Sequence, residues 1–372
     1  MNQTRVALSI QFFHSFVSGV FGVAIPLMMK ARAVDVVVMG LVFAVMPLIM
    51  QFGRMLFATI SDFFGRKIFF ALNGVLGFIS SMIYRFAYTP MEFLFGKVAE
   101  GTKEGAIWAV NRAFLLEREG GNWKALVHLR TVVYISSALG SAMAGFLIVW
   151  VLFEGTMLFC AVFGILTVLA AALISSGEKK QFSMEKALQF LDFRKKTKIF
   201  KIFLFAFSMI GLSYGFIGGY VITNFLKDKG FIDKVIGVLI GARILFAGFS
   251  SYLLSKTASA KQILLVHGIL YSLVFLVLGF LGPAEAGTLI VAFGFIEGMS
   301  SIGQEGILSK ICNKESYGTD IGLLMFGLHM GETISLALSG FLIAAWGFAA
   351  PFLLAALTYT AFYMPAYIAL KD

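Results

Sequence analysis

Charged residues are scarce in this chain. Asp, Glu, Lys and Arg together make up 13% of the 372 residues, whereas 59% are hydrophobic and the mean hydropathy is +0.90. So few polar side chains cannot cover the surface of a water-soluble globule. The composition therefore excludes a soluble protein and favours one that is embedded in a membrane.

Cysteines and catalytic signatures are scarce too. Cys160 and Cys312 are the only cysteines, and the predicted topology places them toward opposite membrane faces, so we expect no disulfide framework. The sequence has no H-E-x-x-H, C-x-x-C or P-loop pattern. We therefore expect no cofactor, no metal site and no ATP-driven step. An enzyme is not expected, and a polytopic membrane enzyme with scattered catalytic residues is kept as an alternative.

Long apolar runs recur along the whole chain instead. A helix needs ~20 mostly apolar residues to cross the hydrocarbon core of a bilayer. The sequence has twelve such stretches, which leave room for short connections but not for a separate soluble domain. The predicted spans are 6–29, 36–60, 68–88, 91–115, 127–150, 153–175, 199–223, 235–255, 262–281, 286–308, 318–345 and 347–370.

Lysine and arginine are distributed unevenly over the connections between these spans. The connections after even-numbered spans, with Lys201 at the start of the seventh span, carry sixteen of them, and those after odd-numbered spans, with Arg85 at the end of the third span, carry six. Basic connections tend to stay on the cytoplasmic side of a membrane. We therefore expect a multi-pass protein of the cell membrane with both termini in the cytoplasm. The formal charge of +10 is then an orientation signal, and we expect no nucleic-acid partner.

The long polar segment 177–201 lies near the middle of the chain and separates six predicted spans from six. We predict an N-terminal bundle over 1–176, a cytoplasmic linker over 177–201 and a C-terminal bundle over 202–372. The two halves match weakly at offsets of 195 and 197 residues, which is typical of a parallel repeat about an axis normal to the membrane. The matched pairs are Ala144–Ile148 with Ser339–Ile343, Glu100-Gly101 with Glu297-Gly298, and Met39–Val42 with Ile236–Leu239.

The connection after the second span reads Ala58-Thr-Ile-Ser-Asp-Phe-Phe-Gly-Arg-Lys67. It resembles the major facilitator superfamily signature G-x-x-x-D-[RK]-x-G-[RK]-[RK], which it matches at Asp62, Gly65, Arg66 and Lys67. Ala58 replaces the first glycine, and Phe63 replaces the first basic residue. The resemblance implies that these four residues form a motif that braces the cytoplasmic gate. The alternative is a positive-inside anchor with an aspartate at a helix end.

Two further segments resemble elements of the same family. Lys97-Val98-Ala99-Glu100-Gly101 is similar to its R-x-x-Q-G element, which is linked to proton coupling. Gly140–Gly145 resembles the G-P-x-x-G-G element of its antiporters, but Ser141 stands in place of proline, and this departure weakens an exporter interpretation. The resemblance implies an all-α membrane protein with twelve transmembrane helices in two pseudo-symmetric six-helix bundles.

Several ionisable residues lie inside the predicted spans, where each costs roughly 2.5–3.5 kcal/mol unless it faces a partner or a wet cavity. On the fourth span a stripe of them must face the bundle interior. It contains Lys97, Glu100, Lys103, Glu104 and Arg112. The alternative is that these charges neutralise one another and only stabilise the bundle.

Other spans carry matching polar positions. They are Gln11 and His14 on the first span, Asn224 after the seventh, Arg243 on the eighth, Glu297, Gln304 and Glu305 on the tenth, and His329 and Glu332 on the eleventh. In the family, the first, fourth, seventh and tenth helices line a central cavity. Burial and neighbouring acids favour the protonated form of a carboxyl group, so Glu297, Glu305 and Glu332, with His329, are the predicted proton sites. An interior, hydrogen-bonded histidine is the alternative for His329.

These observations predict a secondary transporter that moves a small organic solute by alternating access and is coupled to protons. The alternatives are an uncoupled uniporter or a lipid flippase. The excess of acids in the second half favours a cationic or amphipathic solute. Beyond solute, protons and membrane lipids, no partner is expected, and the protein is expected to be monomeric.

Overall fold

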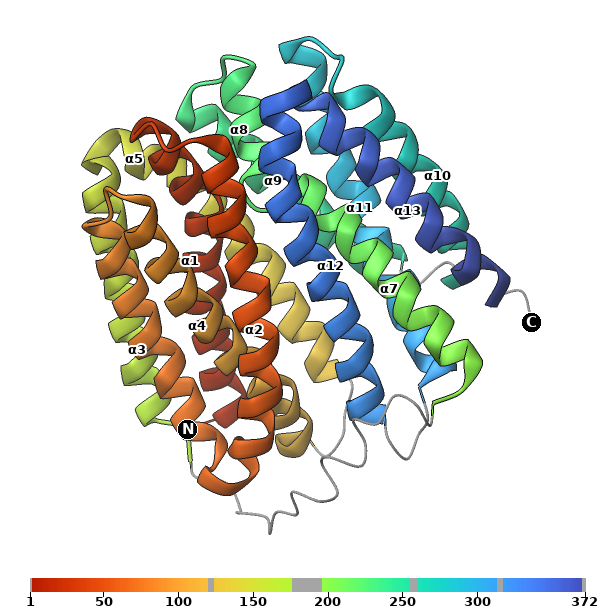
Figure 1. Ribbon diagram of the computed structural model, residues 1–372. Coiled ribbons are helices and arrows are strands. Elements are labelled where there is room, and N and C mark those ends of the chain that lie inside the picture. The colour runs from red at the N-terminus through yellow and green to blue at the C-terminus, as the bar shows by residue number, and fades with distance from the viewer. Residues whose placement is uncertain (1, 120–123, 176–195, 255–259, 313–316, 370–372) are drawn as a thin grey trace.

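The computed structural model describes residues 2–119, 124–175, 196–254, 260–312 and 317–369, and this part of the chain forms helices and no strand (Figure 1). The helices in chain order are α1 (Gln3–Ala31), α2 (Val36–Phe64), α3 (Arg66–Arg85), α4 (Pro90–Arg118), α5 (Lys124–Ala172), α7 (Lys198–Ile217), α8 (Val221–Asp228), α9 (Asp233–Leu254), α10 (Ala260–Leu278), α11 (Pro283–Ile311), α12 (Tyr317–Trp346) and α13 (Ala349–Ala369).

Helix boundaries follow local signals in the sequence. The side chain of Asp35 accepts the amide hydrogen of Val37 at 2.7 Å and caps the start of α2. Pro90 occupies the first turn of α4, and the Glu92 carboxylate accepts the Thr89 amide hydrogen at 2.7 Å in a capping box. Short polar residues therefore end the connections and fix where the apolar helices begin.

Two breaks set the number of membrane crossings. Leu152, with a positive φ of 59°, interrupts α5 so that this helix makes two crossings. Gly218 and Gly219 separate α7 from α8, which together make one crossing. The described helices thus make twelve crossings in two groups of six, and the predicted fold class is confirmed.

Seven helical stretches of the described residues are long and apolar enough to cross a membrane on composition alone. Helices α4 and α11, which carry the predicted polar stripes, are not among them. These two helices depend on their neighbours to cover their charges.

The repeat predicted from sequence recurs in the backbone. Ala33 and Gly230 both have positive φ, at 55° and 87°, and they are 197 residues apart. Leu152 and Gly347 likewise have φ of 59° and 71°, at an offset of 195 residues. Positive φ is uncommon outside glycine, so its recurrence at the two predicted offsets indicates that both halves follow one path.

The matched glycines form the contacts between the halves. A Cβ atom on Gly40 of α2 would lie 3.1 Å from the amide nitrogen of Gly340 in α12. A Cβ atom on Gly237 of α9 would lie 3.0 Å from the amide nitrogen of Gly145 in α5. Both helix pairs thus approach backbone to backbone, as small residues allow in membranes. The predicted pseudo-symmetry exchanges one pair for the other.

The boundaries between the two bundles stay a prediction. Residues 177–195 of the predicted linker lie outside the described residues. Its last part is described, and there the Lys196 ammonium lies 2.6 Å from the Asp320 carboxylate at the start of α12.

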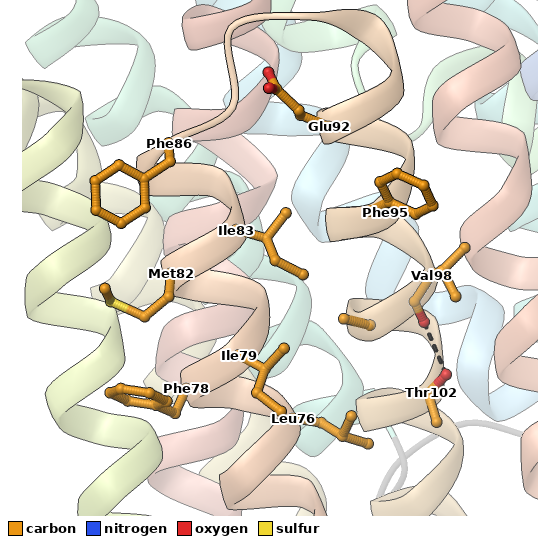
Figure 2. A pocket seen from close by; sticks show the side chains of 11 residues that line it. Leu76, Phe78, Ile79, Met82, Ile83, Phe86, Glu92, Phe95, Val98 and Thr102 are labelled. Carbon is orange, nitrogen blue, oxygen red and sulfur yellow. Dashed lines mark hydrogen bonds between the residues drawn. The ribbon is translucent and has the colours of Figure 1, made fainter.

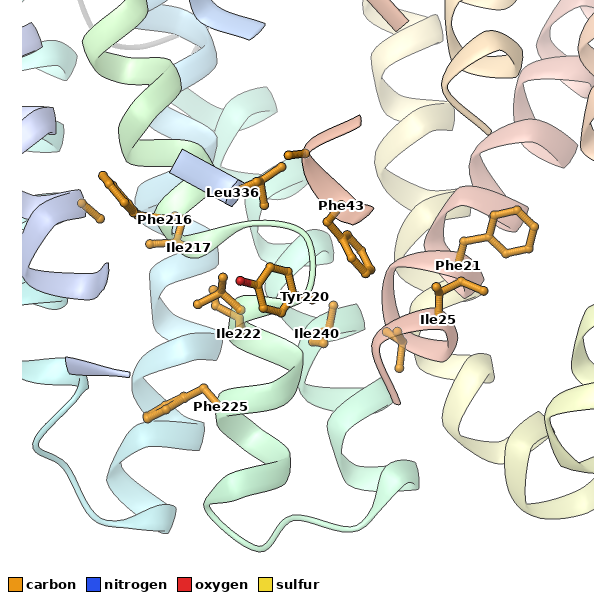
Figure 3. Close-up of a cluster of buried hydrophobic side chains, with 14 of the residues drawn as sticks. Phe21, Ile25, Phe43, Phe216, Ile217, Tyr220, Ile222, Phe225, Ile240 and Leu336 are labelled. Carbon is orange, nitrogen blue, oxygen red and sulfur yellow. The ribbon is translucent and has the colours of Figure 1, made fainter. Parts of the chain in front are cut away.

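Apolar packing joins the two halves at one face of the molecule. We call the face at which α1 begins and α13 ends the terminal face, and the other, at the top of Figure 1, the opposite face. The larger apolar cluster joins the halves toward the opposite face, where it contains Phe21 and Phe43 from the first half and Tyr220 from the second (Figure 3). A second cluster, with Phe70 and Phe114, draws its described members from the first half only. This conformation is therefore closed at the opposite face.

Candidate functional site

The carboxylate of Glu104, on α4, is surrounded by donors from two helices. Its Oε2 lies 3.0 Å from Nε2 of His14 and accepts the indole hydrogen of Trp108 at 3.1 Å. Its Oε1 accepts the Ser18 hydroxyl at 2.7 Å and lies 3.4 Å from the Lys103 ammonium. We call these five residues the Glu104 cluster. Both carboxylate oxygens are fully engaged, so an ionised Glu104 is tolerated here.

The form of His14 follows from Asn73, a neighbour on α3. The Asn73 amide donates to the backbone oxygen of Lys103 and to Nδ1 of His14, both at 2.9 Å. Because the Lys103 oxygen can only accept, it fixes the orientation of the amide. Nδ1 of His14 must then be an acceptor, and its hydrogen lies on Nε2, from which it is donated to Glu104.

Lys97 and Glu100 form a second buried ion pair one turn nearer the opposite face. The ammonium of Lys97 donates to Oε2 of Glu100 at 2.8 Å, and the hydroxyl of Tyr84 on α3 donates to the same oxygen at 2.6 Å. The described residues place no donor on Oε1 of Glu100. Unlike the Glu104 cluster, this pair keeps one carboxylate oxygen open.

The remaining predicted residues of the first half lie apart from the ion pairs. Gln11 is fully buried, where its amide oxygen accepts from Asn111 at 2.8 Å and its amide nitrogen donates to Ser15 at 2.8 Å. This arrangement joins α1 to α4. The guanidinium of Arg112 lies 5.8 Å from the centre of the Trp108 ring. Arg112 therefore lies next to the Glu104 cluster, on the side of the terminal face.

The predicted gating motif joins helices of the first half at the terminal face. Arg66 donates twice to the Glu117 carboxylate at the end of α4, at 2.9 and 2.6 Å. Lys67 donates to the backbone oxygen of Ala172 at 2.7 Å, and Gly65 takes a φ of 83° in the turn between α2 and α3. The side chain of Asp62 lies outside the described part of the structure. The described contacts brace one bundle internally, and a role in gating stays a prediction.

In the second half, Arg243 on α9 and Glu297 on α11 form a bidentate ion pair. Nε and Nη2 of Arg243 each donate to a carboxylate oxygen of Glu297 at 2.9 Å. The Glu297 side chain keeps 36% of its surface exposed, and that of Arg243 keeps 14%. Two parallel charge-assisted bonds fix the orientation of this carboxylate.

A neutral polar cluster lies next to this pair. Gln304 on α11 donates from its amide to the hydroxyl oxygens of Tyr214 at 2.6 Å and of Ser300 at 2.8 Å, and these two hydroxyls also contact each other. Tyr214 comes from α7, so the cluster joins two helices. Glu305 is one residue beyond Gln304, and its side chain lies outside the described residues.

His329 and Glu332 form a half-buried dyad on α12. Nδ1 of His329 lies 3.0 Å from Oε2 of Glu332, and the two side chains are 14% and 27% exposed. Among the described contacts, Oε1 of Glu332 has no donor. Asn224 lies elsewhere, on α8 at the opposite face, where its amide donates to the Met39 sulfur at 3.2 Å.

The structure therefore separates the acids into two kinds. Glu104 and Glu297 have both oxygens occupied by charged or polar donors, so a proton would displace an existing bond. Glu100 and Glu332 each keep an oxygen that can take a proton without loss of a contact. Every one of these four carboxylates is paired with a cation or a histidine.

Sequence reasoning missed Asn73, Tyr84 and Asn111, which orient His14, Glu100 and Gln11. Asn73 and Tyr84 lie on α3, for which no polar stripe was predicted, whereas Asn111 is seven residues beyond Glu104 on α4, where helical spacing could have found it. Their buried positions are the feature that identifies them, and burial was not known from the sequence.

An apolar groove lies away from these residues, between α3 and α4 (Figure 2). It has a volume of about 770 Å³ and is lined by apolar side chains such as Phe78, Phe86 and Phe95, with Glu92 at one end. These side chains are exposed, as expected where a membrane protein meets lipid. A much smaller space of about 10 Å³ lies beside His14, close to the room that one water molecule needs.

Comparisons with known proteins bear on this architecture. The sequence matches the profile of the Major Facilitator Superfamily over residues 7–304. Two crystal structures of the nucleoside transporter NupG, one of them of a mutant, superpose with TM-scores of 0.80 and 0.77 at 16% and 15% identity. Each comparison covers 100% of both chains. No curated protein matches the sequence.

Proposed function

We propose, from the premise that this chain belongs to the major facilitator superfamily, that it carries a small, polar organic solute across a membrane by alternating access. It is a multi-pass membrane protein and a secondary transporter, and family membership points away from an enzyme. The observation that carries the proposal is the placement of charged residues. Ion pairs lie in the middle part of α4 and of α11, the two helices that the repeat makes equivalent.

The pairing of the charges favours a neutral solute. A charged solute would have to compete with the partner that each of Glu100, Glu104 and Glu297 already has. The sequence alone, with its acidic excess, favoured a cationic or amphipathic solute. Gln304, Tyr214 and Ser300 offer amide and hydroxyl groups that suit hydroxyl and amide groups on a ligand. A nucleoside is such a solute, and NupG is a nucleoside transporter of the same fold.

Binding tests this solute class directly. Thermal unfolding of the purified protein should be measured with uridine, with tetraethylammonium and with lactate, which represent neutral, cationic and anionic solutes. Since a ligand of the folded state raises the apparent stability, uridine should raise the unfolding midpoint and the other two should not. A rise with tetraethylammonium alone would restore the cationic solute.

The dyad of His329 and Glu332 is the proposed proton site. It is half-buried, it lies on a helix that packs against the other bundle, and Glu332 keeps one oxygen open for a proton. A proton there would neutralise one member of the dyad and change how α12 contacts α2. Membrane acids with this exposure and a titratable partner are typical of proton relays.

Proteoliposomes test the coupling. Uptake of the solute that passes the binding test should be accumulative when a pH gradient is imposed, and Glu332→Gln should abolish accumulation while solute exchange persists. Glu285→Gln, on the exposed first turn of α11, is the matched control and should behave as the wild type. Accumulation that survives in Glu332→Gln would remove the dyad from the mechanism.

An uncoupled uniporter is the second candidate, and one observation favours it. All four described acids of the candidate site already have a cation or a histidine as partner, as expected for charges that only stabilise the bundles. Equilibrating flux that does not respond to a pH gradient in the wild type would establish this candidate over the coupled one.

A further inference from the structure

The buried ion pair of Lys97 and Glu100 touches the contact that closes the opposite face. The Lys97 ammonium lies 4.1 Å from the centre of the Phe43 ring, on α2 of the same half. The Phe43 ring lies 5.3 Å from that of Tyr220, which belongs to the other half. Figure 3 shows Phe43 and Tyr220 next to each other in the cluster that joins the halves. One ring therefore connects a charge of the candidate site to the partner bundle.

Lys97 has few other contacts that could hold it. Only 2% of its side chain is exposed, and its polar partner among the described residues is Glu100 at 2.8 Å. A buried ammonium needs further electron-rich neighbours, and the faces of Phe43 and, at 5.8 Å, of Tyr84 supply them. The Tyr84 hydroxyl also donates a hydrogen bond to the Glu100 carboxylate. The ion pair is thus held on one side by Tyr84 and on the other by Phe43.

A break in the backbone of the second half places Tyr220 next to the Phe43 ring. The chain breaks between α7 and α8, and Gly219 takes a positive φ of 54° at the break. A Cβ atom on Gly219 would lie 3.1 Å from Cδ1 of Phe43 and 3.0 Å from Cδ2 of Leu336. Glycine at this position therefore serves both the turn and the close approach of Phe43.

We propose that Phe43 is a positioning residue that couples the Lys97–Glu100 ion pair to closure of the opposite face. The inference rests on the alternating-access function proposed above. Opening of this face separates Tyr220 from Phe43 and lets water reach the ring, so the ion pair loses its apolar cover. Conversely, removal of the ion pair takes away an attraction that keeps Phe43 in place and weakens closure.

A cysteine reporter tests this coupling without any solute. Ile25→Cys places a thiol at a position that is 0% exposed in the same cluster, and both native cysteines are buried. In nanodiscs, the rate of maleimide labelling measures how often the opposite face opens. Phe43→Leu should raise this rate roughly tenfold, because the cation loses the ring face. Phe43→Tyr keeps the ring face and should restore a rate near that of the wild type.

The matched control is Phe16→Leu. Phe16 is 4% exposed, close to the 3% of Phe43, but it stacks on Phe163 inside the first half at 4.8 Å. This variant loses the same apolar area without touching the opposite face, and its labelling rate should stay unchanged. An equal rise in Phe16→Leu and Phe43→Leu would overturn the proposal, since it would mark a general loosening.

A double-variant cycle completes the test. Lys97→Met with Glu100→Gln removes the ion pair without leaving a lone buried charge, and it should also speed labelling. If the ion pair acts through Phe43, adding Phe43→Leu to this double variant should not raise the labelling rate further. A rate raised by the product of the two separate effects would overturn the coupling. Phe43→Met replaces the leucine variant if the latter does not fold. If labelling behaves as expected but the protein transports no solute, the proposed function is rejected and this coupling is kept.

Discussion

At the scale of single residues, Tyr220 and Tyr84 are two fully buried tyrosines that differ in their hydroxyl partners. The Tyr84 hydroxyl donates to the Glu100 carboxylate at 2.6 Å. The Tyr220 hydroxyl is buried against the backbone of Gly40 and has no hydrogen-bond partner among the described residues. A buried hydroxyl without a partner costs about 1–3 kcal/mol. The same substitution should therefore have opposite effects at the two positions.

We predict that Tyr220→Phe raises the free energy of unfolding by about 1 kcal/mol, because it removes an unpaired polar atom and keeps the ring. Tyr84→Phe should lower it by about 1.5–3 kcal/mol, because a bond to a charged carboxylate is lost. Thermal unfolding of the two variants in one detergent measures both. A loss of stability in Tyr220→Phe would mean that its hydroxyl has a partner, such as a buried water.

The two cysteines should be inert toward thiol reagents. Burial, with the nearby Asp320 carboxylate, raises the pKa of the Cys312 thiol to about 11, and Cys160 is fully buried on α5. At pH 8 only about 0.1% of such a thiol is thiolate, the form that reacts. Mass spectrometry after maleimide treatment should find both unmodified in the folded protein and both modified after denaturation. Rapid labelling of Cys312 at pH 8 would contradict its burial.

At the scale of elements, close backbone contact between α5 and α9 depends on glycine. A Cβ atom on Gly145 would lie 2.2 Å from the backbone oxygen of Asp233, and a backbone atom cannot move aside as a side-chain end can. Gly22 on α1 is exposed, and nothing lies within 4 Å of the equivalent atom. Alanine substitutions at these two glycines therefore separate the effect of crowding from that of helix propensity.

Gly145→Ala should destabilise the protein by about 1–3 kcal/mol, the usual cost of overpacking, and should loosen the pairing of the two bundles. Gly22→Ala should stabilise it by about 0.5–1 kcal/mol, since alanine favours a helix. Unfolding midpoints provide the comparison. Equal shifts of the same sign in both variants would show that α5 and α9 can separate without cost.

Prediction of the elements succeeded where a signal was repeated along the chain. Apolar runs of sufficient length located the crossings, including the two that meet at Leu152, because hydrophobic length is a local property. The stripe on α4 was found from helical spacing, and Lys97, Glu100, Lys103 and Glu104 are indeed all buried on that helix. The break between α7 and α8 was not predicted. Its glycines lie within an apolar run, and Gly219 is explained by its positive φ and by its contacts with Phe43 and Leu336.

At the scale of the whole molecule, the excess of basic residues in the connections of the terminal face predicts its location. The count of sixteen Lys and Arg residues against six predicts that this face, with both chain ends, lies in the cytoplasm. Lys198 begins α7 at the terminal face, and Glu285 lies in the first turn of α11 at the opposite face; both are exposed. These two positions provide a direct test of orientation.

In intact cells, a membrane-impermeant maleimide should label a cysteine introduced by Glu285→Cys. A cysteine introduced by Lys198→Cys should be labelled only after the cells are permeabilised, because the reagent cannot otherwise reach the cytoplasm. The wild type, whose cysteines are buried, supplies the background. Labelling of Lys198→Cys alone in intact cells would invert the predicted topology.

The sequence by itself determined the membrane environment, the twelve crossings, the repeat at offsets of 195 and 197 residues, and the predicted orientation. Each of these depends on composition or on spacing along one segment, so no knowledge of packing is needed. Only the tertiary structure decided which carboxylate oxygens are occupied, and that Phe43 lies between Lys97 and Tyr220. These contacts join helices far apart in the chain, and they depend on the depth and rotation of each helix, which side-chain packing sets.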